Sequence, residues 1–212
     1  TAERQFRMPL EHGNQRPPSA QWTATAAGAV LIASADSDGR MSSDENGRVS
    51  RIRRIRVESG TIGKVIDAGV KDANQMGSAM APAAVDTLLN HLQDTGRTLD
   101  HYDAVFTGDL GFIGKSIVED LLVDAGFDKA VIDAVYDDCG AMIYEKEQDV
   151  HSGGSGCGCS ASLFAGYVCG KLRKGDFRKV LIMSTGALLS TISPFQGESI
   201  PGIAHAVSLE AE

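Results

Sequence analysis

Short apolar runs and longer segments with helically spaced apolar residues alternate along the chain. The runs predict buried strands, because a continuous apolar stretch of this length fits a strand covered on both faces. The helical spacing predicts amphipathic helices between them. The expected strands are 22–35, 102–107, 179–186 and 203–209, and the expected helices lie within 76–94, 117–126 and 157–173. Strands that alternate with helices are typical of layered α/β proteins.

Residues 49–62 alternate loosely between apolar and charged positions. We expect this segment to pair with residues 22–35 as an antiparallel hairpin, with the polar residues 36–48 as the connection. Four arginines lie between Arg51 and Arg56. Such a run is typical of the solvated face of an edge strand, and it would also suit contact with an acidic lipid surface or partner.

The glycine-rich stretch Ser152–Ala161 leads into an apolar pattern that predicts a buried helix. The first amides of a helix lack intrahelical partners and carry partial positive charge, so the loop is a candidate anion site. Cys157 and Cys159 are candidate nucleophiles at that helix start, and the alternative is that they are small packing residues.

Two further glycine-bearing loops, Thr107–Leu110 and Ser184–Ala187, each end a predicted strand. Strand ends and helix starts converge at ligand sites in α/β folds, so we expect these loops to lie near Ser152–Ala161. Asp137 and Asp138 are candidate cation ligands or turn residues. His205 suits a core histidine better than a catalytic one.

The composition excludes several classes of protein. A net charge of −8 argues against broad nucleic-acid binding, which needs a basic surface. No apolar run approaches the roughly 20 residues that span a bilayer. The spacing of the four cysteines fits neither a zinc ribbon nor a CxxC redox motif, so a reduced, cytosolic protein is expected.

Several segments taken together carry a more specific signal, and they occur in one order over nearly the whole chain. They are Ala2–Arg7, Met76–Ala83, Thr107–Leu110, Tyr136–Gly140, Gly153–Cys157, Thr185–Ser190, and Ser199–Pro201 with Ala204–His205. With these segments the sequence resembles the stage V sporulation protein AD family, which is itself similar to thiolases and ketoacyl synthases.

The resemblance implies a thiolase-like αβαβα layered fold, of which this chain holds only part. Residues 1–62 would supply the last elements of the N-terminal half, and residues 63–212 would form the C-terminal half. A layered fold without one of its halves predicts an exposed apolar face.

The resemblance implies a non-catalytic protein. Condensing enzymes carry a histidine motif where this chain has Thr107–Leu110, and an Asn or His where it has Gly153–Cys157. Neither residue type occurs at those points, and an oxyanion formed in condensation needs such donors.

The function implied by the family is binding of dipicolinic acid, free or as its calcium chelate, for uptake into developing spores and release in germination. Expected partners are other stage V sporulation A proteins at the spore inner membrane and a second copy of the chain. The expected location is the forespore or spore, cytosolic or peripheral on that membrane. Candidate ligand-binding residues are Thr107, Asp109, Gly153, Gly154, Ser155, Gly156 and Cys157, with Asp137 and Asp138 as candidates for a metal.

Two alternatives stay open. One is an acyltransferase or condensing enzyme of the thiolase class, which would need a reactive Cys upstream and a base near Asp109 or His205. The other is a scaffold that docks on a membrane channel complex through Arg51–Arg56 or its apolar faces.

Overall fold

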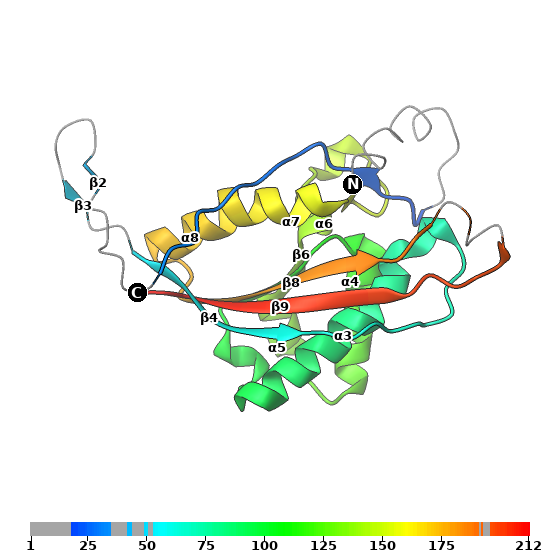
Figure 1. The fold of residues 1–212 in the computed structure, drawn as a ribbon, viewed down its shortest axis with the longest axis horizontal. Coiled ribbons are helices and arrows are strands. Elements are labelled where there is room, and N and C mark those ends of the chain that lie inside the picture. The colour runs from blue at the N-terminus through cyan, green and yellow to red at the C-terminus, as the bar shows by residue number, and fades with distance from the viewer. Residues whose placement is uncertain (1–17, 35–41, 44–48, 51–52, 191, 193–195) are drawn as a thin grey trace.

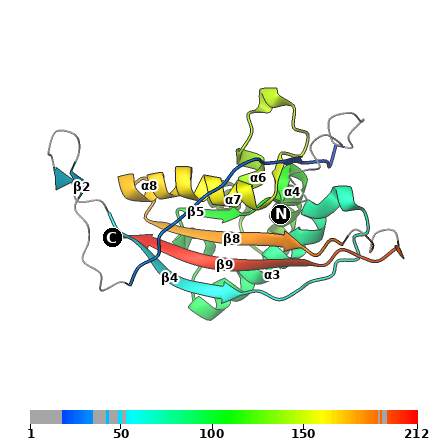
Figure 2. The ribbon, with the colours of Figure 1, turned by 45° about the horizontal axis from the view of Figure 1, so that its top comes forward.

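A computed structural model describes residues 18–34, 42–43, 49–50, 53–190, 192 and 196–212. Two segments singled out from the sequence, Ala2–Arg7 and Arg51–Ile52, lie outside the described residues. The architecture is a mixed sheet between two layers of helices, as Figures 1 and 2 show. This confirms the α/β layering expected from the alternation of strands and helices.

The central sheet has five strands in the order β4-β9-β8-β5-β6. Strands β8, β5 and β6 are parallel, whereas β9 is antiparallel to both of its neighbours. The strand bounds are β4 (Ile55–Ile62), β5 (Ala104–Thr107), β6 (Tyr136–Asp138), β8 (Lys179–Ala187) and β9 (Gly202–Ala211). Two small pairs complete the strands, β1 (Trp22–Thr23) with β7 (Gly154–Ser155), and β2 (Ser42–Ser43) with β3 (Val49–Ser50).

Helices cover both faces of this sheet. One face packs against α3 (Met76–Thr95), α4 (Gly111–Asp124) and α5 (Lys129–Val135). The other packs against a helical run of α7 (Cys157–Leu163), η4 (Phe164–Val168) and α8 (Cys169–Lys174), with α6 (Cys139–Met142) beside it. Short 3-10 turns occupy η1 (Ala73–Gln75), η2 (Leu99–His101) and η3 (Lys146–Gln148).

Successive side chains of β8 point to opposite faces of the sheet, so this one strand contributes to both hydrophobic clusters. Leu181 and Met183 join the cluster with α3 and α4, whereas Val180 joins the cluster with α7 and α8. This is the two-residue period of a strand buried on both faces, and it explains the continuous apolar run in the sequence.

The strands predicted within 102–107, 179–186 and 203–209 are confirmed, as are the helices within 76–94 and 117–126. The helix expected at 157–173 is also present, with a π-helical segment, η4, at its middle. Gly96 ends α3 in a left-handed conformation, which glycine adopts at little cost.

Two predictions about the first third of the chain are wrong. Residues 24–34 form no strand, and Leu31 is 93% exposed rather than buried. Residues 22–35 and 49–62 do not pair as a hairpin, because β4 pairs with β9 and β1 pairs with β7. The partner of β4 lies at the far end of the chain, which local periodicity cannot reveal.

The division of the chain after residue 62 stays a prediction. The structure places β4, from the segment before that division, at the edge of the same sheet as β5 to β9. Large apolar side chains are exposed at Leu31, Ile32 and Ile62. The apolar face expected of a partial layered fold stays a prediction.

Candidate functional site

Three loops from distant parts of the sequence meet through the side chain of Asp109. Its Oδ2 accepts a hydrogen bond from the Gly156 amide at 2.7 Å, and its Oδ1 accepts one from Thr185 Oγ1 at 3.0 Å. The Asp109 amide in turn donates to Thr185 Oγ1 at 3.2 Å. The expectation that the loops after β5 and β8 lie beside the glycine-rich loop is therefore confirmed.

Gln21 ties the described start of the chain to this junction. Its Nε2 donates to the Asp109 carbonyl at 2.9 Å and to the Gly154 carbonyl at 2.7 Å. The Trp22 amide donates to the Gly153 carbonyl at 2.8 Å and so extends the β1–β7 pairing. Gln21 could not be identified from the sequence, because a lone glutamine carries no motif.

The glycines of the loop are required by its backbone. Gly153 and Gly156 have φ of +94° and +100°, which side-chain-bearing residues rarely adopt. A Cβ on Gly154 would lie 2.5 Å from Ile143 Cγ2. Gly153, Gly154, Ser155 and Gly156 are buried, and Cys157 is the first exposed residue after them.

The amides of this loop are partly used within the protein. Gly153 donates to the Val150 carbonyl at 3.0 Å, and Gly156 donates to Asp109. Within the described part of the chain, the amide of Cys157 has no hydrogen-bond partner. The accessible part of the predicted anion site is therefore the start of α7 rather than the glycines before it.

Asp138 organises the neighbouring loop from a fully buried position. Its Oδ2 accepts hydrogen bonds from Thr107 Oγ1 at 2.7 Å and the Leu110 amide at 3.0 Å. Its Oδ1 accepts from the amides of Gly111 at 2.8 Å and Ala141 at 3.0 Å. Burial raises the pKa of Asp138 to about 6, against the lowering effect of Thr107 and the Leu110 and Gly111 amides.

Thr107 and Asp137, two of the predicted site residues, also face protein partners. The Thr107 hydroxyl lies 2.9 Å from Tyr136 Oη, in addition to its bond to Asp138. Asp137 pairs with Lys115 Nζ at 2.8 Å. Among the described residues, Asp137 and Asp138 join no group of three His, Cys, Asp or Glu side chains that could hold a metal ion.

The cysteines differ sharply in accessibility, although none of the four forms a disulfide in the described chain. Cys139 and Cys159 are buried, and burial raises the pKa of Cys139, as does the nearby Asp138 carboxylate. A raised pKa disfavours the thiolate that nucleophilic chemistry needs. Cys157 is exposed, so the packing interpretation holds for Cys159 but not for Cys157.

His205 lies on β9, where it pairs with Ser184 of β8, the residue before Thr185. It is exposed, contrary to the expected core position, and its Nδ1 accepts a hydrogen bond from the Gly63 amide at 3.1 Å.

In the described part of the chain, no helix combines the length and apolar character needed to cross a bilayer.

Comparison with known proteins identifies one family over the chain. The family model for stage V sporulation protein AD matches residues 1–210. The stage V sporulation protein AD of Bacillus subtilis (strain 168) is 44% identical over 210 residues, which cover 99% of this chain and 56% of that relative. The chain therefore spans a little over half the length of this relative.

Solved structures similar to this one include thiolases and a condensing enzyme. An acetyl-CoA acetyltransferase from Bacillus anthracis has a TM-score of 0.39 at 15% identity, covering 77% of this chain and 32% of its own. Human mitochondrial 3-ketoacyl-CoA thiolase has a TM-score of 0.37 at 16% identity, with coverages of 77% and 31%. The tetronic acid condensing enzyme AbyA1 has a TM-score of 0.42 at 14% identity, with coverages of 74% and 47%.

Proposed function

The chain belongs to the stage V sporulation protein AD family, and we propose that in sporulation it acts as a non-catalytic binding protein for dipicolinic acid. The proposed ligand is a pyridine dicarboxylate, taken up into the developing spore and released in germination. Its two carboxylates call for backbone amides, hydroxyls and a helix dipole rather than for a nucleophile.

One observation carries the proposal: the helical run Cys157–Lys174 begins directly beside the loops that Asp109 joins. Asp109 and Gln21 hold the glycine loop so that Cys157 emerges at the surface with its amide unpartnered among the described residues. The aligned peptides of the run place partial positive charge at this point. One carboxylate of the ligand would bind there, within reach of the half-buried Ser160.

The acidic side chains around the site do not act as free charges against an anion. The Asp109 carboxylate accepts two hydrogen bonds and Asp138 accepts four. Asp137 is paired with Lys115. If Ca²⁺ enters, it would enter as cargo chelated by dipicolinate.

The non-catalytic part of the proposal is supported by the thiols. Cys139 and Cys159 are buried, and burial raises the pKa of Cys139, which opposes formation of a thiolate. An acyltransferase is the second candidate, favoured by a single observation, the exposed Cys157 beside the glycine loop. If the protein transferred an acyl group from an acyl-CoA, and if Cys157→Ser abolished this activity, the result would support the acyltransferase instead.

The partners and location follow from the family resemblance and belong to the same proposal. They are other stage V sporulation A proteins, a homodimeric assembly, and a peripheral position on the inner membrane of the forespore or spore. The scaffold alternative assigns that membrane position to the arginines near the start of β4.

Calorimetry tests the proposal directly. The chain, and a version extended to the length of its relatives, should each be titrated with millimolar dipicolinate with and without Ca²⁺. Saturable heat with dipicolinate and much weaker heat with picolinate, which has one carboxylate, is the expected result. No heat from either protein under either condition would overturn the proposal.

A further inference from the structure

Strand β4 is the most weakly buried strand of the central sheet. It lies at the sheet edge, and within the described part of the chain its strand partner is β9 alone. None of its residues is fully buried, and Val57 and Ile62 are 55% and 91% exposed. With so little apolar burial, its attachment depends strongly on the β9 ladder and on its polar contacts.

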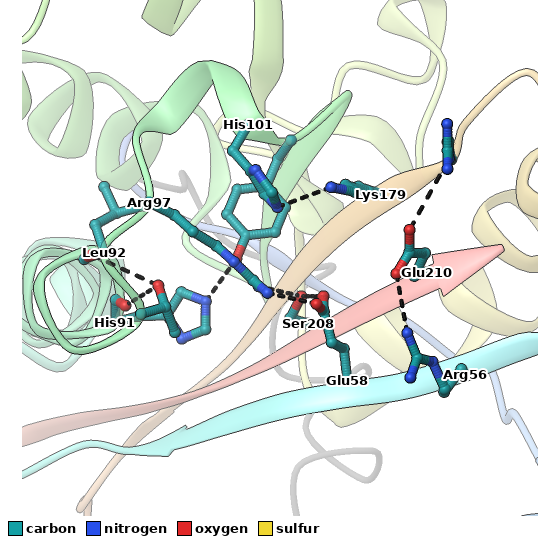
Figure 3. Close-up of polar contacts among 12 residues, drawn as sticks. Arg56, Glu58, His91, Leu92, Arg97, His101, Lys179, Ser208 and Glu210 are labelled. Carbon is teal, nitrogen blue, oxygen red and sulfur yellow. Dashed lines mark hydrogen bonds and ion pairs between the residues drawn. The ribbon is translucent and has the colours of Figure 1, made fainter. Parts of the chain in front are cut away.

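A cluster of polar side chains joins β4 to the rest of the molecule, as Figure 3 shows. On one side Arg97 pairs with Glu58, and Ser208 Oγ donates to Glu58 Oε2 at 3.2 Å. On the other, Thr61 Oγ1 lies 2.8 Å from His91 Nδ1. We call this cluster the β4 clasp; it consists of Glu58, Thr61, His91, Arg97, Tyr102 and Ser208.

A β-bulge sets the geometry of the clasp. The register between β4 and β9 shifts between Val57 and Ser59, so Glu58 is the extra residue of β4. A bulge re-aims the side chain that it carries. Glu58 thereby meets Arg97, which follows α3, while Thr61 meets His91 on α3 itself.

The hydrogen bonds run in one direction through Tyr102. Arg97 can only donate, and its Nη1 lies 3.1 Å from Tyr102 Oη. Tyr102 Oη therefore accepts from Arg97, and in the tautomer with the ring proton on Nδ1 it donates to His91 Nε2, 2.7 Å away. His91 then keeps its proton on Nδ1 and donates it to Thr61 Oγ1. The closed clasp is satisfied by a neutral imidazole.

We propose that the β4 clasp is acid-sensitive, and that protonation of His91 releases strand β4 from the sheet. A proton on Nε2 would leave two donors, Arg97 and His91, directed at the same Tyr102 oxygen. It would also place a second positive charge beside the guanidinium of Arg97 in a fully buried position. Detachment of β4 exposes the ring to water and removes this conflict.

Charged groups from several elements act on His91. Burial lowers the pKa of His91, and so do Arg97 and His101, whereas Asp94 and Glu58 raise it. Asp94 is exposed, and Glu58 is paired with Arg97. The net direction is downward, so the closed state binds the proton less well than the open state.

The sign and size of the effect follow from linkage. A histidine whose pKa is lowered in the closed state stabilises that state fully above its ordinary pKa of 6.5, and the stabilisation is lost as pH falls below it. One proton can raise the open population by at most about eightfold between pH 7.0 and pH 5.5. A steeper response would need more than one group.

Hydrogen exchange on the full chain tests the proposal. Protection factors of the β4 amides, corrected for intrinsic rates, should fall by about five- to eightfold from pH 7.0 to pH 5.5. Core amides of β8 should change less. In His91→Gln the amide nitrogen can donate to Thr61 and the oxygen can accept from Tyr102, so β4 protection should change less than twofold.

His151→Gln is the control, because His151 is an exposed histidine in the turn before Gly153 and lies outside the β4 clasp. In that variant the protection of the β4 amides should fall between pH 7.0 and pH 5.5 as much as it does in the unaltered chain. Constant β4 protection in the unaltered chain, or an unchanged response in His91→Gln, would overturn the proposal.

If His91→Gln does not fold, the ring of the unaltered protein decides by NMR. The His91 ring resonance should remain at its neutral position as long as β4 is protected. Ordinary titration of His91 with β4 still protected would refute the acid-sensitive clasp.

Discussion

The carboxylate of Asp109 accepts a 2.7 Å hydrogen bond from the amide of Gly156, 47 residues further along the chain. Through this bond the loop that ends β5 fixes the loop that starts α7. The other carboxylate oxygen holds Thr185 at the end of β8. Asp109 is thus the side chain through which three strand-end and helix-start loops become one site.

Replacing Asp109 with Asn should lower the free energy of unfolding by about 1–3 kcal/mol, because one of its two acceptor oxygens becomes a donor in a buried site. Urea unfolding monitored by circular dichroism measures this change. Asp124→Asn is the control, since Asp124 is exposed at the end of α4 and should change stability by less than about 0.5 kcal/mol. Equal losses in both variants would contradict the linking role of Asp109.

Asp138 should titrate in the native protein near pH 6, because burial raises the pKa of its carboxyl to about 6. Between about pH 4 and pH 6 the native state then holds a proton that the unfolded chain releases. The contribution of Asp138 to stability therefore declines as pH rises through this window. Carboxyl ¹³C NMR measures the midpoint. A midpoint at or below 4 would show that the hydrogen bonds to Asp138 outweigh its burial.

The sequence alone predicted the elements whose signal is local. The buried strand β8 and the helix α3 were identified because their apolar periodicity extends over many residues. The meeting of the β5, β8 and glycine loops also follows from the sequence, since the ends of neighbouring strands in an α/β sheet share an edge.

What the sequence could not provide were pairings that depend on distant partners. The apolar run Ala29–Ala33 has the composition of a strand, yet the described chain offers it no neighbouring strand and Leu31 is exposed. The β4 clasp was likewise missed, because His91 and Glu58 are unremarkable singly and meet only when β4 pairs with β9.

Gly77 should be intolerant of a side chain, because it allows α3 to approach α4 closely. A Cβ at Gly77 would lie 2.1 Å from the Leu110 carbonyl oxygen and 3.4 Å from Gly114 Cα. Gly77→Ala should therefore lower the unfolding free energy by about 1–3 kcal/mol. Thermal and urea unfolding check this.

Gly170→Ala in α8 provides the matched control, since outside the adjacent helix backbone no atom of the described residues lies within 4 Å of the added Cβ. There the better helix propensity of alanine should raise stability by about 0.5–1 kcal/mol. If both variants lost the same unfolding free energy, the close packing at Gly77 would not be the cause of the destabilisation in Gly77→Ala.

A negative charge at Cys157 should weaken dipicolinate binding if the ligand lies at the start of α7. Cys157→Glu should bind about tenfold more weakly than Cys157→Gln, which has nearly the same shape without the charge. Added salt should narrow the difference between the two variants. Gln93→Glu adds the same charge at an exposed position on α3 and should leave affinity unchanged. Calorimetry of the four proteins gives the comparison.

Comparing Cys157→Glu with Cys157→Gln distinguishes an error in the proposed position of the ligand from an error in the proposed binding of dipicolinate. If the unaltered protein binds and the Glu and Gln variants bind equally well, dipicolinate lies elsewhere on the molecule. Weaker binding by Cys157→Glu cannot be attributed to unfolding, because a carboxylate in the first turn of α7 interacts favourably with the helix dipole. Its melting temperature should equal or exceed that of Cys157→Gln, so a loss of affinity without a loss of stability assigns the ligand to the start of α7.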